Sequence, residues 1–236
     1  MTRIALFAVT LLVAACGENA ALSTATPTSP ATSTSTASVA PTPAAATTPA
    51  ATTSAGALSW TVTSASKATA SVREQLVGVS LPSDAVLVAS GAAGTFTLNV
   101  DLSFSPDSKI TFDLTTLTSD SRDRDNFVKM DTLQTRQFPT ATFVPTKASG
   151  LSALPASGTF TFKLTGNLTI HGKTKEVTFD VSATRTGGEL KATATLNPTM
   201  RFGDFGMSAP SVPFRVVSVV DEIRLVVELV ANGAAA

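Results

Sequence analysis

The strongest constraint on the fold is a strict alternation of apolar and polar residues within residues 158–188. From Phe160 to Ile170 the even-numbered positions are apolar or glycine and the odd-numbered positions are polar, and the alternation resumes from Val177 to Thr184. Successive side chains of a β-strand point to opposite faces, so each run presents one apolar face. Two such runs joined by a short glycine-containing turn predict a β-hairpin.

The same period recurs along the chain and predicts an all-β domain. Half-covered alternating strands are typical of antiparallel sheets, whereas a parallel sheet shows continuous apolar runs separated by helices. Besides the hairpin, the expected strands are residues 58–62, 68–79, 85–89, 95–104, 109–117, 139–144, 190–196 and 223–229.

One segment departs from the strand period. Between residues 119 and 138 the apolar residues have a loosely helical spacing, and Asp120 with Ser121 offers a helix N-cap, which predicts a short helical insertion. Closing about eight to ten antiparallel strands into a barrel removes exposed sheet edges. We therefore expect an extended antiparallel β-barrel of eight strands or slightly more. At that size the interior either is filled by side chains or holds one small ligand, and the pattern leaves both open.

Composition excludes several classes of function. The chain has 17 basic and 17 acidic residues, so no net charge draws it to nucleic acid, and no nucleic-acid partner is expected. Its single cysteine, Cys16, and single histidine, His171, are too few for a disulfide in the domain or a thiol or imidazole metal centre. With no catalytic triad or carboxylate pair supported, we expect neither an enzyme nor a cofactor.

The N-terminus has the features of an export signal. Arg3 precedes the apolar run 4–15, which has the length of a signal-peptide core and is too short to span a bilayer. Val13, Ala14 and Ala15 come directly before Cys16, which resembles a bacterial lipobox. By that resemblance Cys16 becomes a lipid-modified N-terminus on the periplasmic or extracellular side of the cell membrane. The alternative is an ordinary signal peptide with a chance cysteine.

A segment of low complexity follows the cysteine. Residues 17–57 consist mainly of Ala, Thr, Ser and Pro with one charged residue, Glu18, and cannot bury enough apolar surface to offset the entropy of ordering. The expected organisation is thus a signal peptide (1–15), a lipid-anchored disordered linker (16–57) and a β-barrel domain (58–236).

Four motifs carry a family resemblance. They are RDRDNF at 122–127, FPTATF at 138–143, TGNLTIHGKTK at 165–175 and RFGDFG at 201–206. In order and spacing they resemble the YceI-like family. The resemblance implies a lipocalin-like extended antiparallel barrel whose apolar lumen holds a polyisoprenoid chain.

Under that resemblance the inward apolar faces are the candidate ligand-binding residues. They are Phe96, Leu98, Val100, Phe112, Leu114, Phe143, Phe160, Phe162, Leu164, Leu168, Ile170, Val177, Phe179, Leu225 and Val227. We expect a non-enzymatic carrier of a polyisoprenoid, lipid or quinone at the cell envelope, anchored to the membrane through Cys16. The alternative is a structural or interaction barrel with a packed core and no ligand. Whether the protein is a monomer or a homodimer is left open.

Charged and polar motif residues have structural interpretations. Glu74 interrupts an apolar face and is interpreted as either a charge in the lumen or a residue of the barrel rim. The charged residues 122–125 are interpreted as fixing the helical insertion through capping and ion pairs, with binding of a ligand head group as the alternative. His171, directly before Gly172, is interpreted as a turn or packing residue, with a ligand contact as the alternative.

Overall fold

The computed structural model describes residues 56–233. The predicted signal peptide, Cys16 and nearly all of the predicted linker lie outside the described residues. Within residues 56–233, ten antiparallel strands form one sheet. The strands are β1 (Leu58–Val62), β2 (Lys67–Leu76), β3 (Ser83–Ala89), β4 (Ala93–Leu98), β5 (Lys109–Asp113), β6 (Thr140–Ser149), β7 (Gly158–Ile170), β8 (Lys173–Thr186), β9 (Glu189–Leu196) and β10 (Val216–Gly233).

Eight of these strands close into a ring. The order runs β1-β4-β5-β6-β7-β8-β9-β10, and β10 returns to β1 through pairs such as Trp60 with Gly233. The β2–β3 hairpin extends the sheet from β10, to which β2 is hydrogen-bonded. This arrangement confirms the predicted all-β antiparallel barrel.

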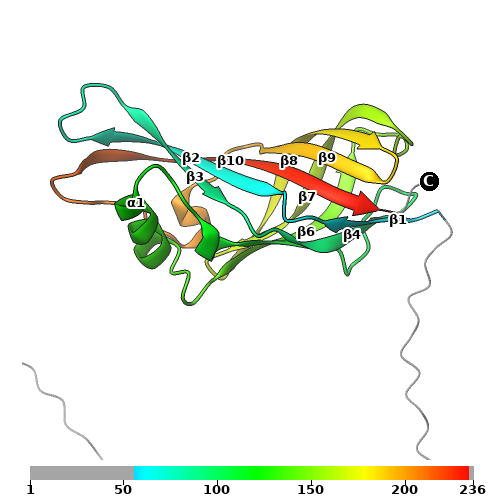
Figure 1. The fold of residues 1–236 in the computed structure, drawn as a ribbon, viewed down its shortest axis with the longest axis horizontal. Helices are drawn as coiled ribbons and strands as arrows, with labels where there is room; N and C mark the ends of the chain where they lie inside the picture. The colour runs from blue at the N-terminus through cyan, green and yellow to red at the C-terminus, as the bar shows by residue number, and fades with distance from the viewer. Residues whose placement is uncertain (1–55, 234–236) are drawn as a thin grey trace, which may run out of the picture. The chain divides into compact units, whose positions relative to one another are not determined.

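Strand β10 links the two ends of the domain. One of its edges pairs with β9, while the other pairs first with β2 and then, near its C-terminal end, with β1. Figure 1 shows the β2–β3 turn, helix α1 (Arg122–Phe127) and the start of β10 together at one end of the domain, which we call the hairpin end. Strand β1 and Gly233 lie at the opposite end, which we call the β1 end.

The hairpin predicted first is confirmed as β7 and β8. These strands pair continuously from Gly158 with Arg185 to Ile170 with Lys173. The turn contains His171 at φ 51°, and its ring packs edge-on against Phe138 with the ring centroids 4.8 Å apart. His171 is therefore a turn and packing residue, as interpreted from the sequence.

The other predicted strands are present, but several boundaries were wrong. Strand β4 ends at Leu98 rather than continuing to residue 104, because the Leu102 N–H donates to the Asn99 carbonyl at 3.0 Å and Leu102 adopts φ 63°, which closes a turn. Strand β10 begins at Val216, well before the predicted start at Ile223. Its first part pairs with β2 through register shifts, which break the alternation that sequence reasoning follows.

The predicted helical insertion is confirmed between β5 and β6. A 3-10 turn, η1 (Leu114–Thr116), precedes helix α1, and a π-helical turn, η2 (Val128–Thr132), follows it. Ser121 caps α1, accepting a hydrogen bond from the Arg124 N–H at 3.4 Å. A second 3-10 turn, η3 (Phe202–Phe205), lies between β9 and β10 and buries Phe205 completely.

Candidate ligand-binding cavity

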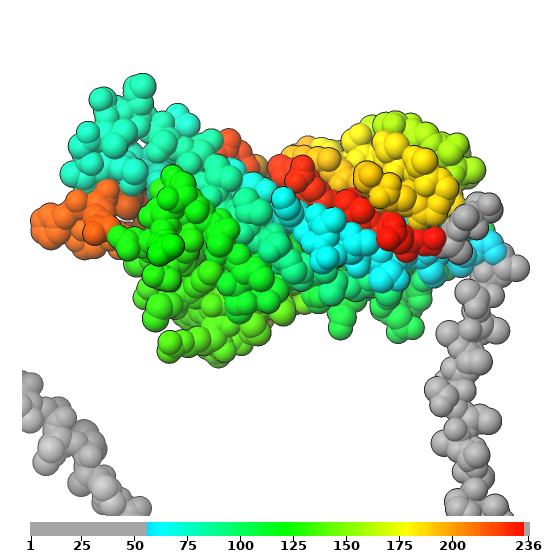
Figure 2. All heavy atoms as spheres, viewed as in Figure 1, coloured from blue at the N-terminus to red at the C-terminus, as the bar shows by residue number. Residues whose placement is uncertain are grey.

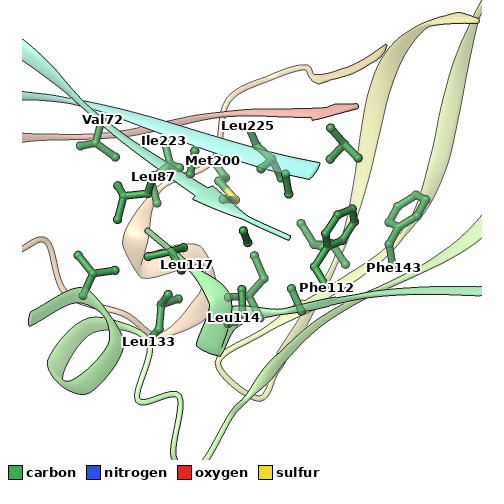
Figure 3. A pocket seen from close by; sticks show the side chains of 18 of the residues that line it. Val72, Leu87, Phe112, Leu114, Leu117, Leu133, Phe143, Met200, Ile223 and Leu225 are labelled. Carbon is green, nitrogen blue, oxygen red and sulfur yellow. The ribbon is translucent and has the colours of Figure 1, made fainter. Parts of the chain in front are cut away.

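The inward side chains of the barrel enclose a cavity of about 910 Å³. Its walls come from both the ring and the β2–β3 hairpin, and α1, η1, η2 and η3 complete them. Figure 3 shows apolar side chains from these elements pointing into one common space; the labelled ones are Val72, Leu87, Phe112, Leu114, Leu117, Leu133, Phe143, Met200, Ile223 and Leu225. Such a volume is far beyond the roughly 30 Å³ that one water occupies in the liquid.

Most of the side chains predicted to bind a ligand line this cavity. They are Phe96, Leu98, Phe112, Leu114, Phe143, Phe160, Phe162, Leu164, Leu168, Ile170, Phe179, Leu225 and Val227. Contact of these residues with a ligand stays a prediction.

Two predicted lining residues were misplaced. Val100 lies in the turn after β4 and is 72% exposed, because the strand on which its inward position was counted has already ended. Val177 shares the phase of Phe179 and packs against the core, but it does not reach the cavity.

Sequence reasoning missed the part of the wall formed by β2, β3 and the helical turns. Val72 and Leu87 lie in segments where apolar and polar residues alternate, so the alternation could have identified them as facing inward. Leu133, Met200 and Phe202 also line the cavity, but they lie in turns without a strand period. No pattern in the sequence identifies these three as neighbours of the barrel interior.

Alanines at inward positions explain why the interior is not filled. Ala70 on β2, Ala141 on β6, Ala183 on β8 and Ala192 on β9 all line the cavity. A methyl group reaches only a short way from the wall, so these positions leave room in the interior. A larger side chain there would occupy space that is now empty.

One buried ion pair lies in the wall. Arg124 of α1 donates to the Glu74 carboxylate of β2 at 2.6 Å, and their side chains are 17% and 8% exposed. Arg124 also pairs with Asp120. Glu74 is thus a charge in the cavity wall rather than an exposed rim residue, and its pairing with Arg124 ties α1 to β2. The interpretation of residues 122–125 as fixing the insertion agrees with this geometry.

The cavity opens at the hairpin end. The lining residues that are exposed to solvent all belong to the β2–β3 turn, α1–η2 and the segment before β10: Val77, Val79, Asp123, Asn126, Met130, Asp131, Phe214 and Arg215. Across this opening Arg215 pairs with Asp123 of α1 at 2.6 Å.

The β1 end is occupied by a buried arginine. Arg185 is 2% exposed, and its guanidinium carbon lies 5.6 Å from the centroid of the Trp60 ring, a cation–π distance. Its Nη1 donates to the Pro155 carbonyl at 3.3 Å. Trp60 itself lines the cavity, so the Arg185 guanidinium lies next to the cavity wall at this end.

The titratable groups with shifted pKa values lie outside the cavity. The hydrogen bond from Lys175 holds the pKa of Asp204 below its usual range, and Lys163 does the same for Asp180. Within residues 56–233, no group of three His, Cys, Asp or Glu side chains has a geometry that could hold a metal ion. The same part of the chain contains no helix long and apolar enough to cross a membrane.

Solved structures share this fold. BcnA from Burkholderia cenocepacia is 21% identical, with a TM-score of 0.54, over 72% of this chain and 99% of that one. A polyisoprenoid binding domain from Saccharophagus degradans is 10% identical, with a TM-score of 0.55, over 74% of this chain and 98% of that one. At these identities the likeness shows the fold alone.

A sequence relative and a family model show the family to which the chain belongs. A UPF0312 protein of Pseudomonas putida strain W619 is 36% identical over 110 residues, which cover 44% of this chain and 54% of that protein. The chain therefore spans about half the length of that curated relative. The model of the YceI-like domain matches residues 60–231, which include all of the ring except the first two residues of β1 and the last two of β10. This chain belongs to the YceI-like family.

Proposed function

We propose that this protein is a non-enzymatic binding or carrier protein that holds a polyisoprenoid or a similar apolar amphiphile in the barrel. The observation that carries the proposal is the cavity of about 910 Å³ lined by Phe, Leu, Ile, Val and Ala side chains. The name of the Saccharophagus domain, which has the same fold, points to the same class of ligand.

The cavity suits an apolar chain in size and chemistry. Ligand pockets in proteins usually measure roughly 300–1,000 Å³, so this one lies near the upper end. At about 25 cal/mol per Å² of apolar area, removing 400 Å² of ligand from water contributes roughly 10 kcal/mol before the cost of immobilisation. The paired Glu74 and Arg124 leave this part of the wall without an uncompensated charge that would oppose an apolar ligand.

The cavity argues against a barrel with a packed core and no ligand. Protein interiors pack like organic crystals, with few voids larger than a water molecule. The inward alanines instead leave a continuous space between strands on facing sides of the ring.

Export and lipid modification at Cys16 would place this carrier beside a membrane, and we include them in the proposal. A metabolic label in a fatty acid should enter the wild-type chain and be absent from the Cys16→Ser chain. Equal labelling of both would contradict the anchor.

Native mass spectrometry tests the carrier function most directly. The full chain, released from its own cell envelope by proteolytic cleavage within residues 17–57 and purified without detergent, should carry a near-stoichiometric mass excess. That excess should leave on denaturation and fit repeating C5 units. A bare protein mass from this source would overturn the proposal.

Filling the cavity gives a matched variant test. Ala192→Phe on β9 points a large ring into the cavity, whereas Thr193→Phe on the same strand points outward from an exposed position. Binding of the apolar fluorophore N-phenyl-1-naphthylamine should fall for Ala192→Phe and persist for Thr193→Phe. If both variants bound the fluorophore like the wild type, its site would lie outside the cavity.

A further inference from the structure

Exposed apolar side chains gather around the opening of the cavity. We call this group the apolar rim. Its residues are Val77, Val79 and Leu81 from the β2–β3 turn, Met130 from η2, Phe214 from the segment before β10, and Val217 and Val220 from the first part of β10. Phe214 is 95% exposed and Leu81 is 76% exposed.

The apolar rim is continuous with the cavity wall. Single exposed apolar residues are ordinary on protein surfaces, but a group of them around an opening marks an interaction site. Val77, Val79, Met130 and Phe214 belong to both the rim and the lining. Figure 2 shows the β2–β3 turn and the segment before β10 projecting beside each other at the hairpin end of the domain.

We propose that the apolar rim inserts into the surface of a lipid bilayer and docks the opening of the cavity on the membrane. An apolar ligand then passes between the bilayer and the cavity along a continuous apolar path, without crossing water. This inference rests on the proposed function, because it assumes that the ligand is a membrane lipid.

The charges at the opening point to insertion that is driven by apolar contact. Arg215 and Asp123 compensate each other at 2.6 Å, the third exposed charge in the lining is the acidic Asp131, and the chain has no net charge. Electrostatic binding to anionic lipid needs a cluster of Lys and Arg, and each added cation contributes about 1 kcal/mol. Docking should therefore require neither anionic lipid nor low salt.

The shape of the hairpin end favours a bilayer over a second copy of the chain. A standard protein interface buries about 800 Å² on each partner with close shape complementarity. Here most of the rim residues lie on the β2–β3 turn and on the segment around the start of β10, which project beside each other at the hairpin end (Figure 2). Such turns suit shallow insertion, to roughly 5–10 Å, at the boundary between headgroups and acyl chains.

The chain preceding the domain is long enough for this orientation. It enters at β1, at the end opposite the rim, and the 18 residues of β10 join the two ends over at most about 60 Å. Residues 17–57 can extend to at most about 140 Å. A domain anchored at Cys16 can therefore turn its rim toward the membrane that holds the anchor.

Flotation with phosphatidylcholine vesicles tests the proposal, using the chain without residues 1–15 and with Cys16→Ser. The chain should float with the vesicles, and neither 0.5 M NaCl nor added phosphatidylserine should change the bound fraction. Phe214→Ser and Leu81→Ser should each lower the partition coefficient roughly tenfold. Val100→Ser is the matched control, because Val100 is 72% exposed but lies in the turn after β4, away from the rim.

Several results would overturn the proposal. They are an absence of flotation by the parent chain, an equal loss for Val100→Ser, or binding that disappears in salt. Light scattering without vesicles tests whether the rim binds a second copy of the chain instead. If the parent chain is a dimer that Phe214→Ser dissociates, and the chain does not float, the rim is a dimer interface. Native mass spectrometry tests ligand binding independently of flotation. A mass excess without flotation would therefore support the carrier function and contradict membrane docking.

Discussion

Glu74 and Arg124 each place a charge in or beside the apolar wall, and each compensates the other. The Glu74 side chain is 8% exposed, and its carboxylate accepts a hydrogen bond from Arg124 at 2.6 Å. Removing one member of a buried pair leaves an uncompensated charge, whereas replacing both by apolar groups can be close to neutral.

This pair predicts a strong coupling energy. Arg124→Met should lower the free energy of unfolding by roughly 3 kcal/mol, because Glu74 then stays buried without its partner. Glu74→Leu combined with Arg124→Met should lie within about 1 kcal/mol of the wild type. Urea unfolding of the two single variants and the double variant measures the cycle. Additive losses would show that the two residues contribute independently.

The ion pair of Asp204 predicts that the free energy of unfolding depends on pH. The hydrogen bond from Lys175 and one from the Arg201 N–H lower its pKa in the folded state below the usual value of 3.8. A lowered folded-state pKa stabilises the protein above the unfolded value, and this contribution is lost as the pH falls through the folded pKa. Asp204→Asn should therefore destabilise the protein at pH 7 and have less effect at pH 3.

Urea unfolding at the two pH values checks this expectation. Lys175→Met should also destabilise the protein more at pH 7 than at pH 3. Its effect should be smaller than that of Asp204→Asn, because the Arg201 N–H still donates to Asp204 at 2.8 Å. An Asp204→Asn difference that is equal at both pH values would contradict the assignment.

At the scale of the elements, closure of the ring depends on the short contact between β4 and β5. These strands share only the pairs from Ala93 with Thr111 to Thr95 with Lys109. Gly94 lies in the middle at φ 132°, and a Cβ atom there would lie 2.0 Å from the Lys109 carbonyl oxygen. The position therefore combines a backbone conformation that favours glycine with a close approach of two strands.

Gly94→Ala should consequently lower the free energy of unfolding by about 3 kcal/mol or more, because the strain and the clash fall on one pairing of the ring. Gly203→Ala is the matched control: Gly203 has an ordinary φ, and a Cβ atom there would have no neighbour within 4 Å. The control should change stability by less than about 0.5 kcal/mol. If urea unfolding gave the same loss of stability for Gly94→Ala and Gly203→Ala, strand pairing at Gly94 would not require glycine.

For the whole molecule, the cavity predicts that an apolar ligand stabilises the fold. A ligand that binds only the folded state at one hundred times its dissociation constant adds about 2.7 kcal/mol to the free energy of unfolding. N-phenyl-1-naphthylamine should produce this shift in the wild type and in Thr193→Phe. Ala192→Phe should not respond, because its ring occupies the space. An equal shift in all three proteins would mean that the fluorophore stabilises from outside the cavity.

Strand periodicity is a local property, and it identified most of the fold. The alternation from Phe160 to Ile170 is continuous, so β7 and β8 followed directly from it, as did the phase of nearly all of the predicted lining residues. It failed where local geometry interrupts the period: at the turn that closes with Leu102, and at the shifted register in the first part of β10.

The sequence by itself determined most of the strands and of their inward faces and the position of the helical insertion, because alternation and capping act between near neighbours in the chain. Only the tertiary structure decided that Trp60 meets Gly233 to close the ring and that Arg124 compensates Glu74. The same holds for the cavity and its apolar rim. These features depend on residues far apart in the chain meeting in space, and on how much of the enclosed volume the inward alanines leave empty.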